Sequence, residues 1–323
     1  ATSGQPQRAA QYGPFPDGFI QVPHCLEYRK QWDVENYGER AANAIEEVIL
    51  REGPDTVGCL VLEPVTAGGG VIVPPKGYWE RVQQICEKYQ ILLHIDEVVC
   101  GVGRTGKLFA HEWAGVTPDI MGVAKGIGGG FPLGACLATK EAGKGMIAGT
   151  HGTTYGGNPL AMAVGNAVLD VVLADGFLDH VRAMGARLRQ KLGAVQAQHA
   201  GVIEEVRGEG LMLGLKLVPN NGEFAAAARG EHVLVIPAGD NVVRLLPPLI
   251  IGEAEVDEAV KRLDAACARM EAAKKVLLEG FRLPSLERAM YYHAEYINPK
   301  WNKERVAKVG AHIFYSDEPA KGK

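Results

Sequence analysis

The chain has 323 residues, of which 47% are hydrophobic and 22% are charged, and its formal net charge is −4. This composition is typical of a globular protein, and the length allows two domains with buried cores. A mildly acidic chain lacks the basic surface that nucleic acids and anionic membranes attract. We therefore expect neither of these partners.

The six cysteines lie far apart, and none forms a C-x-x-C pair. Their spacing predicts buried, reduced thiols in a cytoplasmic protein, and neither a disulfide framework nor a metal site. No apolar run reaches the roughly 18 residues of a membrane helix, and we find no signal peptide. The chain opens on a Gly- and Pro-rich stretch without an initiator Met, which indicates the middle of a longer sequence.

The first half of the chain alternates helical and strand patterns. Apolar residues recur at helical spacing in 37–51 and 77–89, which predicts two helices. Short apolar runs predict buried strands at 57–63, 91–95, 119–124 and 133–138. Strands separated by helices are typical of an α/β fold with a mainly parallel sheet covered on both faces. Ligands of such sheets bind at the carboxyl ends of the strands.

The pattern changes from about residue 158. Two long helices are expected at 158–174 and 177–199, and residues 202–217 alternate like paired strands. Further strands are expected at 232–239 and 241–251, followed by an amphipathic helix at 253–274. We therefore expect a large domain, a smaller C-terminal α/β domain and a helical tail, over residues 1–172, 173–274 and 275–323.

Two glycine-rich stretches resemble nucleotide-binding loops without completing the pattern. Residues 101–107, GVGRTGK, fit the first seven positions of a phosphate loop, but Leu108 stands where Ser or Thr would hold magnesium. Residues 126–130, GIGGG, lack the spacing of a dinucleotide fingerprint. We expect no nucleotide cofactor, and we interpret Arg104 as a structural loop residue.

Two charged residues end neighbouring predicted strands. Asp96 closes one strand, and Lys125 follows the next, flanked by Ala124 and Gly126. A buried Lys is a suitable Schiff-base nucleophile because desolvation lowers its pKa. An Asp beside a pyridine nitrogen keeps that nitrogen protonated, which is the electron-sink arrangement of pyridoxal 5'-phosphate (PLP) chemistry. Each residue alone would be an ordinary surface or ion-pair residue, so the combination carries the hypothesis.

Several motifs occur in a fixed order: I-D-E-V, G-R-T-G, P-D-I, A-K-G, G-G-x-P-L-G and T-Y-G-G-N-P. In this order, over roughly residues 1–272, the chain resembles the class III, PLP-dependent aminotransferases. From about residue 102 onward it is most similar to acetylornithine aminotransferases. Before that residue it is more similar to taurine–pyruvate and other ω-amino-acid transaminases. The resemblance implies the PLP-transferase fold of type I and a homodimer with shared active sites.

The resemblance also implies roles for individual residues. Lys125 would attach the cofactor and move the substrate proton, Asp96 would pair with the pyridine nitrogen, and Val98 would pack against the ring. Thr154 would bind the cofactor phosphate of the neighbouring subunit. Arg244 would grip the substrate carboxylate, for which its planar fork is suited.

The chain departs from the acetylornithine pattern at two positions. Val99 follows D-E-V where those enzymes usually carry Gln, and Gly68 stands where they carry a Glu. Because Gly68 cannot form an ion pair with Arg244, the substrate pocket is expected to be of the ω-amino-acid kind. Glu63, before Pro64, is a further substrate-side candidate, with a purely structural carboxylate as the alternative.

The family's N-terminal phosphate loop and ring-stacking segment have no counterpart in this sequence. Residues 275–323 fit no part of the family, and short helices are expected there at 285–296 and 303–309. Three functions therefore stay open: transamination from an acetylornithine-like ω-amino acid to a 2-oxo acid by a ping-pong Schiff-base mechanism, a taurine- or β-alanine–pyruvate transaminase, and a silent fragment acting as an interaction module.

Overall fold

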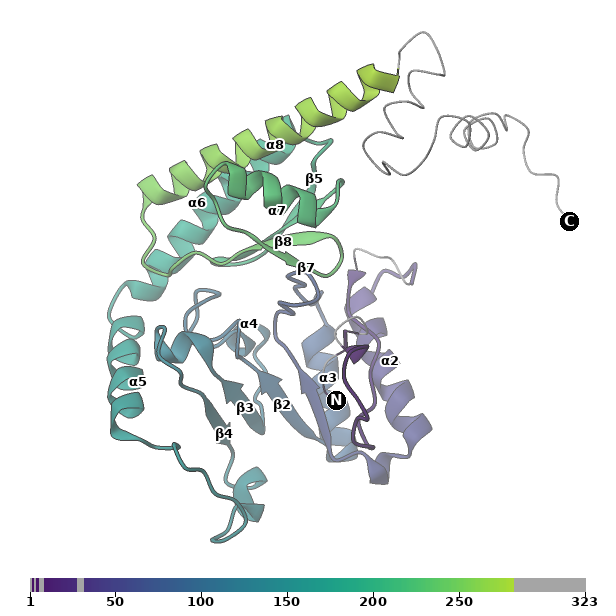
Figure 1. Ribbon diagram of the computed structural model, residues 1–323. Coiled ribbons are helices and arrows are strands. Elements are labelled where there is room, and N and C mark those ends of the chain that lie inside the picture. The colour runs from purple at the N-terminus through teal and green to yellow at the C-terminus, as the bar shows by residue number, and fades with distance from the viewer. Residues whose placement is uncertain (1, 3, 6–8, 28–31, 282–323) are drawn as a thin grey trace, which may run out of the picture. The chain divides into compact units, whose positions relative to one another are not determined.

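The computed structural model describes residues 2, 4–5, 9–27 and 32–281 (Figure 1). The chain forms two compact units, Ala1–Ala266 and Cys267–Lys323. Helix α8, Glu253–Phe281, begins in the first unit and continues into the second. It extends seven residues beyond the helix expected at 253–274, whereas the short helices predicted at 285–296 and 303–309 lie outside the described residues.

The first sheet has the order β1-β2-β3-β4. Its strands are β1 Cys59–Leu62, β2 Leu92–Asp96, β3 Ile120–Val123 and β4 Ala135–Ala138. β1, β2 and β3 are parallel, and β4 pairs with β3 in the antiparallel direction. The α/β fold with a mainly parallel sheet is thus confirmed.

Two helices cover one face of this sheet, α2 Tyr37–Glu52 and α3 Tyr78–Tyr89. Their apolar stripes meet the inward residues of the strands in one core, in which Ile45, Val82 and Ile95 are fully buried. Burial alternates along β2, as expected of a strand with only one tightly packed face. These helices and strands start and end within two residues of their predicted positions.

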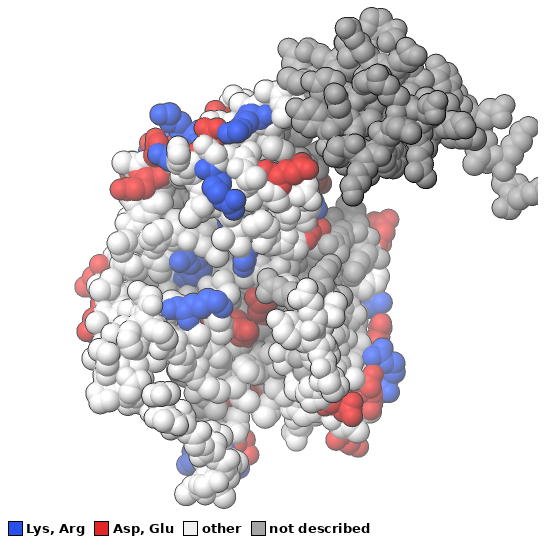
Figure 2. Space-filling view, viewed as in Figure 1, with Lys and Arg blue, Asp and Glu red and all other residues white. Residues whose placement is uncertain are grey.

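The expectation that helices cover both faces is wrong for β4, which is exposed along its whole length. No crossover helix joins β3 to β4, and a parallel return needs a crossover of about a dozen residues or more. The strand therefore returns antiparallel at the edge. In the view of Figure 2, the surface at the lower left, where Figure 1 places β4, is mostly uncharged. Cys59 and Cys136 are exposed on the sheet, which corrects the prediction that they are buried.

The second sheet lies in the same compact unit and is antiparallel, in the order β5-β6-β8-β7. Its strands are β5 Ile203–Glu209, β6 Met212–Leu217, β7 Ile236–Ala238 and β8 Val242–Leu245. The helices of this half are α5 Pro159–Val172, α6 Phe177–Gln198 and α7 Asn221–Gly230. Shorter turns of helix are α4 His111–Ala114, η2 Pro54–Thr56, η3 Lys125–Gly128 and η4 Ala142–Gly145.

The hairpin between β7 and β8 has a tight turn of fixed handedness. The Val242 N–H donates to the Gly239 carbonyl at 3.2 Å, and the two central residues have positive φ, 55° at Asp240 and 53° at Asn241. These values define a type I′ turn, which requires Asn, Asp or Gly at its centre. The turn fixes the start of β8.

No single helix among the described residues is long and apolar enough to cross a membrane. The bent pair α5 and α6 passes the same test together, by length and composition only.

Gly185 in α6 offers a direct test of the packing between this helix and the second sheet. A Cβ at Gly185 would lie 2.5 Å from the Gly210 carbonyl oxygen, whereas a Cβ at Gly193 on the same helix would meet nothing within 4 Å. We expect Gly185→Ala to destabilise the chain by about 1–3 kcal/mol. Gly193→Ala should stabilise it by roughly 0.5–1 kcal/mol because Ala favours helix. Urea unfolding measures both, and equal effects would contradict the packing.

Candidate active site

Strand register brings the two predicted carboxylates to the same edge of the first sheet. Leu62 pairs with Ile95, so Glu63 follows β1 where Asp96 ends β2. Asp96 in turn pairs with Gly122 of β3, three residues before Lys125. Parallel strands end at a common edge, and the three residues therefore meet at the carboxyl ends of β1, β2 and β3.

The Asp96 carboxylate is held by its own backbone. The Val98 N–H donates to Asp96 Oδ1 at 2.9 Å, which is the Asx turn that Asp forms two residues ahead. Asp96 and Val98 are both partly exposed at the strand end. The carboxylate is thus oriented before any ligand arrives.

Lys125 is exposed in this chain, which corrects the expectation of a buried amine. It begins η3 in the left-handed region, with φ 49°. A non-glycine residue in this region costs on the order of 1–3 kcal/mol, and such strain is typical of functional sites. The neighbouring glycines, Gly126 and Gly129, allow the tight turn that carries the lysine.

Glu63 brings the charged residues of the site together. Its Oε2 accepts a hydrogen bond from the Ala67 N–H at 3.0 Å. Burial raises the pKa of Glu63, and the charge of Asp96 raises it further, whereas the positive charges of Lys125 and Arg244 lower it. The charges of Asp96, Lys125 and Arg244 therefore all act on this one carboxyl group.

Arg244 comes from the second sheet, on β8. It pairs with Gly214 of β6 and with Ile236 of β7, and its side chain is partly buried. Gly68, which stands where acetylornithine enzymes carry Glu, brings no carboxylate to the site. Its carbonyl instead accepts from the Gly239 N–H at 3.0 Å.

In Figure 2, acidic and basic side chains lie close together in the middle of the face shown. Thr154 lies in an exposed turn before α5 and takes no part in the contacts that join Glu63 to the other residues. Its role as a phosphate ligand of a neighbouring subunit stays a prediction.

Sequence reasoning overlooked Glu97, whose side chain is fully buried next to Asp96. Its carboxylate accepts from the backbone N–H groups of Ala110 and His111, at 3.0 and 2.8 Å. It also lies 2.9 Å from His111 Nδ1 and 3.4 Å from Cys100 Sγ. Glu97 therefore closes the loop that leaves β2. The sequence signal for Glu97 is the Asp-Glu pair at the end of β2, because a second carboxylate that is buried there needs hydrogen-bond partners.

Arg104 is the structural loop residue that the sequence indicated. Its Nη1 donates to the carbonyls of Leu211, at 3.2 Å, and Pro247, at 2.5 Å, and burial lowers the pKa of its guanidinium to about 10. Through Arg104, the glycine-rich stretch 101–107 therefore connects the loop after β2 to backbone next to the second sheet.

Fold and site together define an α/β protein with an amine and two carboxylates at the edge of one sheet and a guanidinium on a second sheet. The Aminotransferase class-III family model matches residues 1–267. The chain belongs to the class III aminotransferases, as its motifs predicted.

Individual relatives agree with this assignment. The chain is 51% identical over 278 residues to the acetylornithine aminotransferase of Brucella melitensis, covering 85% of this chain and 64% of the relative. It is 47% identical over 298 residues to the taurine–pyruvate aminotransferase of Rhodobacter capsulatus, covering 84% and 65%. The solved PLP-bound amine transaminase of an uncultivated Pseudomonas species superposes with a TM-score of 0.77 at 36% identity, covering 83% of this chain and 65% of that one. The chain thus spans just under two thirds of the length of these proteins.

Replacing Glu63 by Gln removes the buried charge and keeps an oxygen that can accept from Ala67. Because the pKa of Glu63 is raised in the folded chain, folding binds a proton there, and this group's contribution to stability falls as the pH rises above 4.5. We expect E63Q to resist urea better than the parent at pH 8 and to lose this advantage near pH 4. A pH-independent difference would contradict the assignment.

Replacing Glu97 tests the buried carboxylate. Glu97→Ala should destabilise the chain by roughly 2–5 kcal/mol, since two buried backbone N–H groups lose their acceptor. Glu97→Gln keeps one acceptor oxygen and should therefore lose less unfolding free energy than Glu97→Ala. Glu141 is exposed and forms an ion pair with Lys144 on the surface, and E141Q should change the free energy of unfolding by less than about 0.5 kcal/mol. Equal losses at the two positions, measured in urea, would refute the role of Glu97.

Proposed function

We propose that the protein transfers an amino group from an ω-amino acid to a 2-oxo acid, with PLP as its cofactor. The observation that carries this proposal is the strand register that brings Asp96 and Lys125 to the same sheet edge as Glu63, where the charge of Arg244 also lowers the pKa of the Glu63 carboxyl group. An amine, a carboxylate and a guanidinium are three groups that transamination of an amino acid requires. The family match and the PLP-bound relative support the same reaction.

The residues present fit PLP by their chemistry. Lys125 offers an exposed amine for covalent attachment, and the carboxylate that Val98 orients at Asp96 suits a protonated pyridine nitrogen. The partly exposed Val98 side chain offers an apolar contact for a ring. PLP, when bound, supplies an electron sink for the bond that breaks at the amino-bearing carbon.

The chain's own residues would perform the remaining tasks. The Lys125 amine would take the proton from the amino-bearing carbon of the donor. It would return a proton when the amino group is transferred to the 2-oxo acid. Asp96 would hold the proton on the pyridine nitrogen. Arg244 would bind the carboxylate of the amino acid through two parallel N–H bonds, which fixes the direction in which the donor enters.

Val99 and Gly68 favour an ω-amino acid as the donor. Gly68 has no side chain and therefore offers no carboxylate at the position where acetylornithine-type enzymes carry a Glu. A taurine- or β-alanine–pyruvate transaminase is the second candidate, supported by 47% identity to a taurine–pyruvate aminotransferase. We favour both over a silent interaction module, because Lys125, Asp96 and Arg244 are all present.

The proposal also includes a cytoplasmic homodimer in which Thr154 binds the cofactor phosphate of the neighbouring subunit. Within the chain, we keep the division into a large domain, residues 1–172, and a small domain, residues 173–274.

Covalent labelling tests the cofactor and its lysine. We expect PLP to give the purified chain a visible absorbance, and borohydride reduction followed by peptide mapping to place the pyridoxyl group on Lys125. Lys125→Ala should abolish both the label and amino transfer from β-alanine or taurine to pyruvate. Lys140→Ala, at an exposed lysine, should change neither. Labelling spread over several surface lysines, or activity that survives in K125A, would overturn the proposal.

A further inference from the structure

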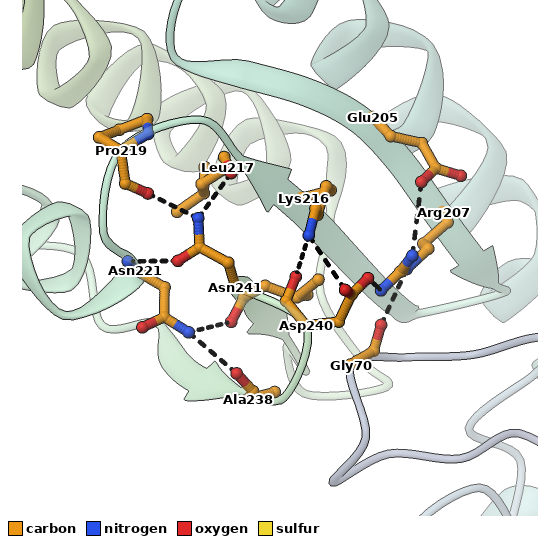
Figure 3. A network of polar contacts seen from close by, with 11 residues as sticks. Gly70, Glu205, Arg207, Lys216, Leu217, Pro219, Asn221, Ala238, Asp240 and Asn241 are labelled. Atoms are coloured by element: carbon orange, nitrogen blue, oxygen red, sulfur yellow. Dashed lines mark hydrogen bonds and ion pairs between the residues drawn. The ribbon is translucent and has the colours of Figure 1, made fainter. Parts of the chain in front are cut away.

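A partly buried network of charges lies on the second sheet and in its β7–β8 turn (Figure 3). Arg207 of β5 is only 2% exposed, and its Nη2 donates to Asp240 Oδ2 at 2.9 Å. Lys216 of β6 donates to Asp240 Oδ1 at 3.1 Å and to the Asp240 carbonyl at 2.6 Å. Glu205 accepts from Arg207 at 3.4 Å. Two cations thus face two carboxylates, and Asp240 stands at the centre.

The same arginine reaches the first sheet. Its Nε donates to the Gly70 carbonyl at 2.9 Å, and Gly70 lies in the loop that follows Glu63. Such a charge-assisted bond inside the protein is stronger than a neutral one. Asp240 accepts from Nη2 of the same guanidinium, so the pair connects the tip of the β7–β8 hairpin to this loop.

Backbone meets backbone beside this pair. The Gly239 N–H donates to the Gly68 carbonyl at 3.0 Å. A Cβ at Gly70 would lie 2.6 Å from the Gly239 oxygen, and a Cβ at Gly239 would lie 2.7 Å from the Gly69 oxygen. Glycines at both positions therefore let the loop and the hairpin touch without intervening side chains.

The loop also packs on the strand pair that carries the substrate arginine. Val71 is fully buried, and a Cβ on Gly214 would lie 3.0 Å from Val71 Cβ. Gly214 is the register partner of Arg244 on β8. The loop after Glu63 and the strand of Arg244 are thus fixed against each other at three places: the Arg207 bond, the glycine contact and Val71.

We propose that Arg207 and Asp240 are a positioning pair that sets where Arg244 stands relative to Glu63, and thereby sets the affinity for the carboxylate of the amino donor. Neither residue need touch the substrate. The inference rests on the proposed function, because it gives Arg244 the task of binding that carboxylate. Small displacements of a positioning group lower affinity or rate strongly, so the pair should matter more for the substrate than for folding.

Asp240→Asn separates the charge of Asp240 from its place in the turn. Asn tolerates the positive φ of the turn, but it lacks the charge that Arg207 and Lys216 face. The control is Asp257→Asn, which removes an equal charge from the exposed pairs of α6 and α8 with Arg187 and Lys191. Arg207→Lys serves as the milder variant should other changes at that position fail to fold.

Two readouts decide the inference. With pyruvate as acceptor, D240N and R207K should raise the KM for β-alanine about tenfold and leave kcat near the parent value. The KM for benzylamine should also stay near the parent value, because benzylamine has no carboxylate. Hydrogen exchange should accelerate in 64–72 and 236–246 and stay unchanged in α2 and α3. D257N should change neither readout.

Other results would overturn the inference. Equal losses for β-alanine and benzylamine, or a fall in kcat alone, would show a general structural role. Unchanged exchange in the two segments would show that the pair does not hold them. An inactive parent chain would count against the proposed function instead, and the exchange of these two segments in D240N would then decide the inference by itself.

Discussion

The parallel register of β1, β2 and β3 is the constraint on which the candidate site depends. Backbone hydrogen bonds between strands, and not side-chain contacts, place Glu63, Asp96 and Lys125 at one edge. A shift of one residue would turn every side chain to the opposite face. The core formed with α2 and α3 specifies the register, because only one alternation buries Leu93 and Ile95.

The loops beyond the strand ends are held by buried polar groups. Glu97 supplies acceptors to backbone N–H groups that otherwise have none, and Arg104 satisfies carbonyls of the second sheet. Arg104 belongs to the stretch whose glycines resemble a phosphate loop, and Glu97 lies four residues before that stretch. The role of Arg104 is therefore structural: its side chain joins the loop after β2 to backbone that adjoins strands β6 and β8.

Much of this arrangement could be predicted from the sequence. Apolar periodicity located the helices and the central strands, and the strand ends identified Asp96 and Lys125. The antiparallel return of β4 could not be predicted, because a short apolar run carries no strand direction. Helix α7 was missed although Asn220 accepts from Gly222 and Glu223 as an N-cap, since its alanine run lacks a contrasting polar face. The exposure of Lys125 depends on which segments cover the strand ends, and periodicity does not report this.

The contact between the loop at Gly68–Gly70 and the turn at Gly239 has a consequence for how such a protein diversifies. Where main chain rests directly on main chain, almost any new side chain would force the two sheets apart. Mutation at these glycines is consequently restricted, whereas partly exposed positions such as Val98 and Val99 can change without disturbing this contact. A lineage built on this frame would vary such positions while the approach of the loop to the hairpin is inherited intact.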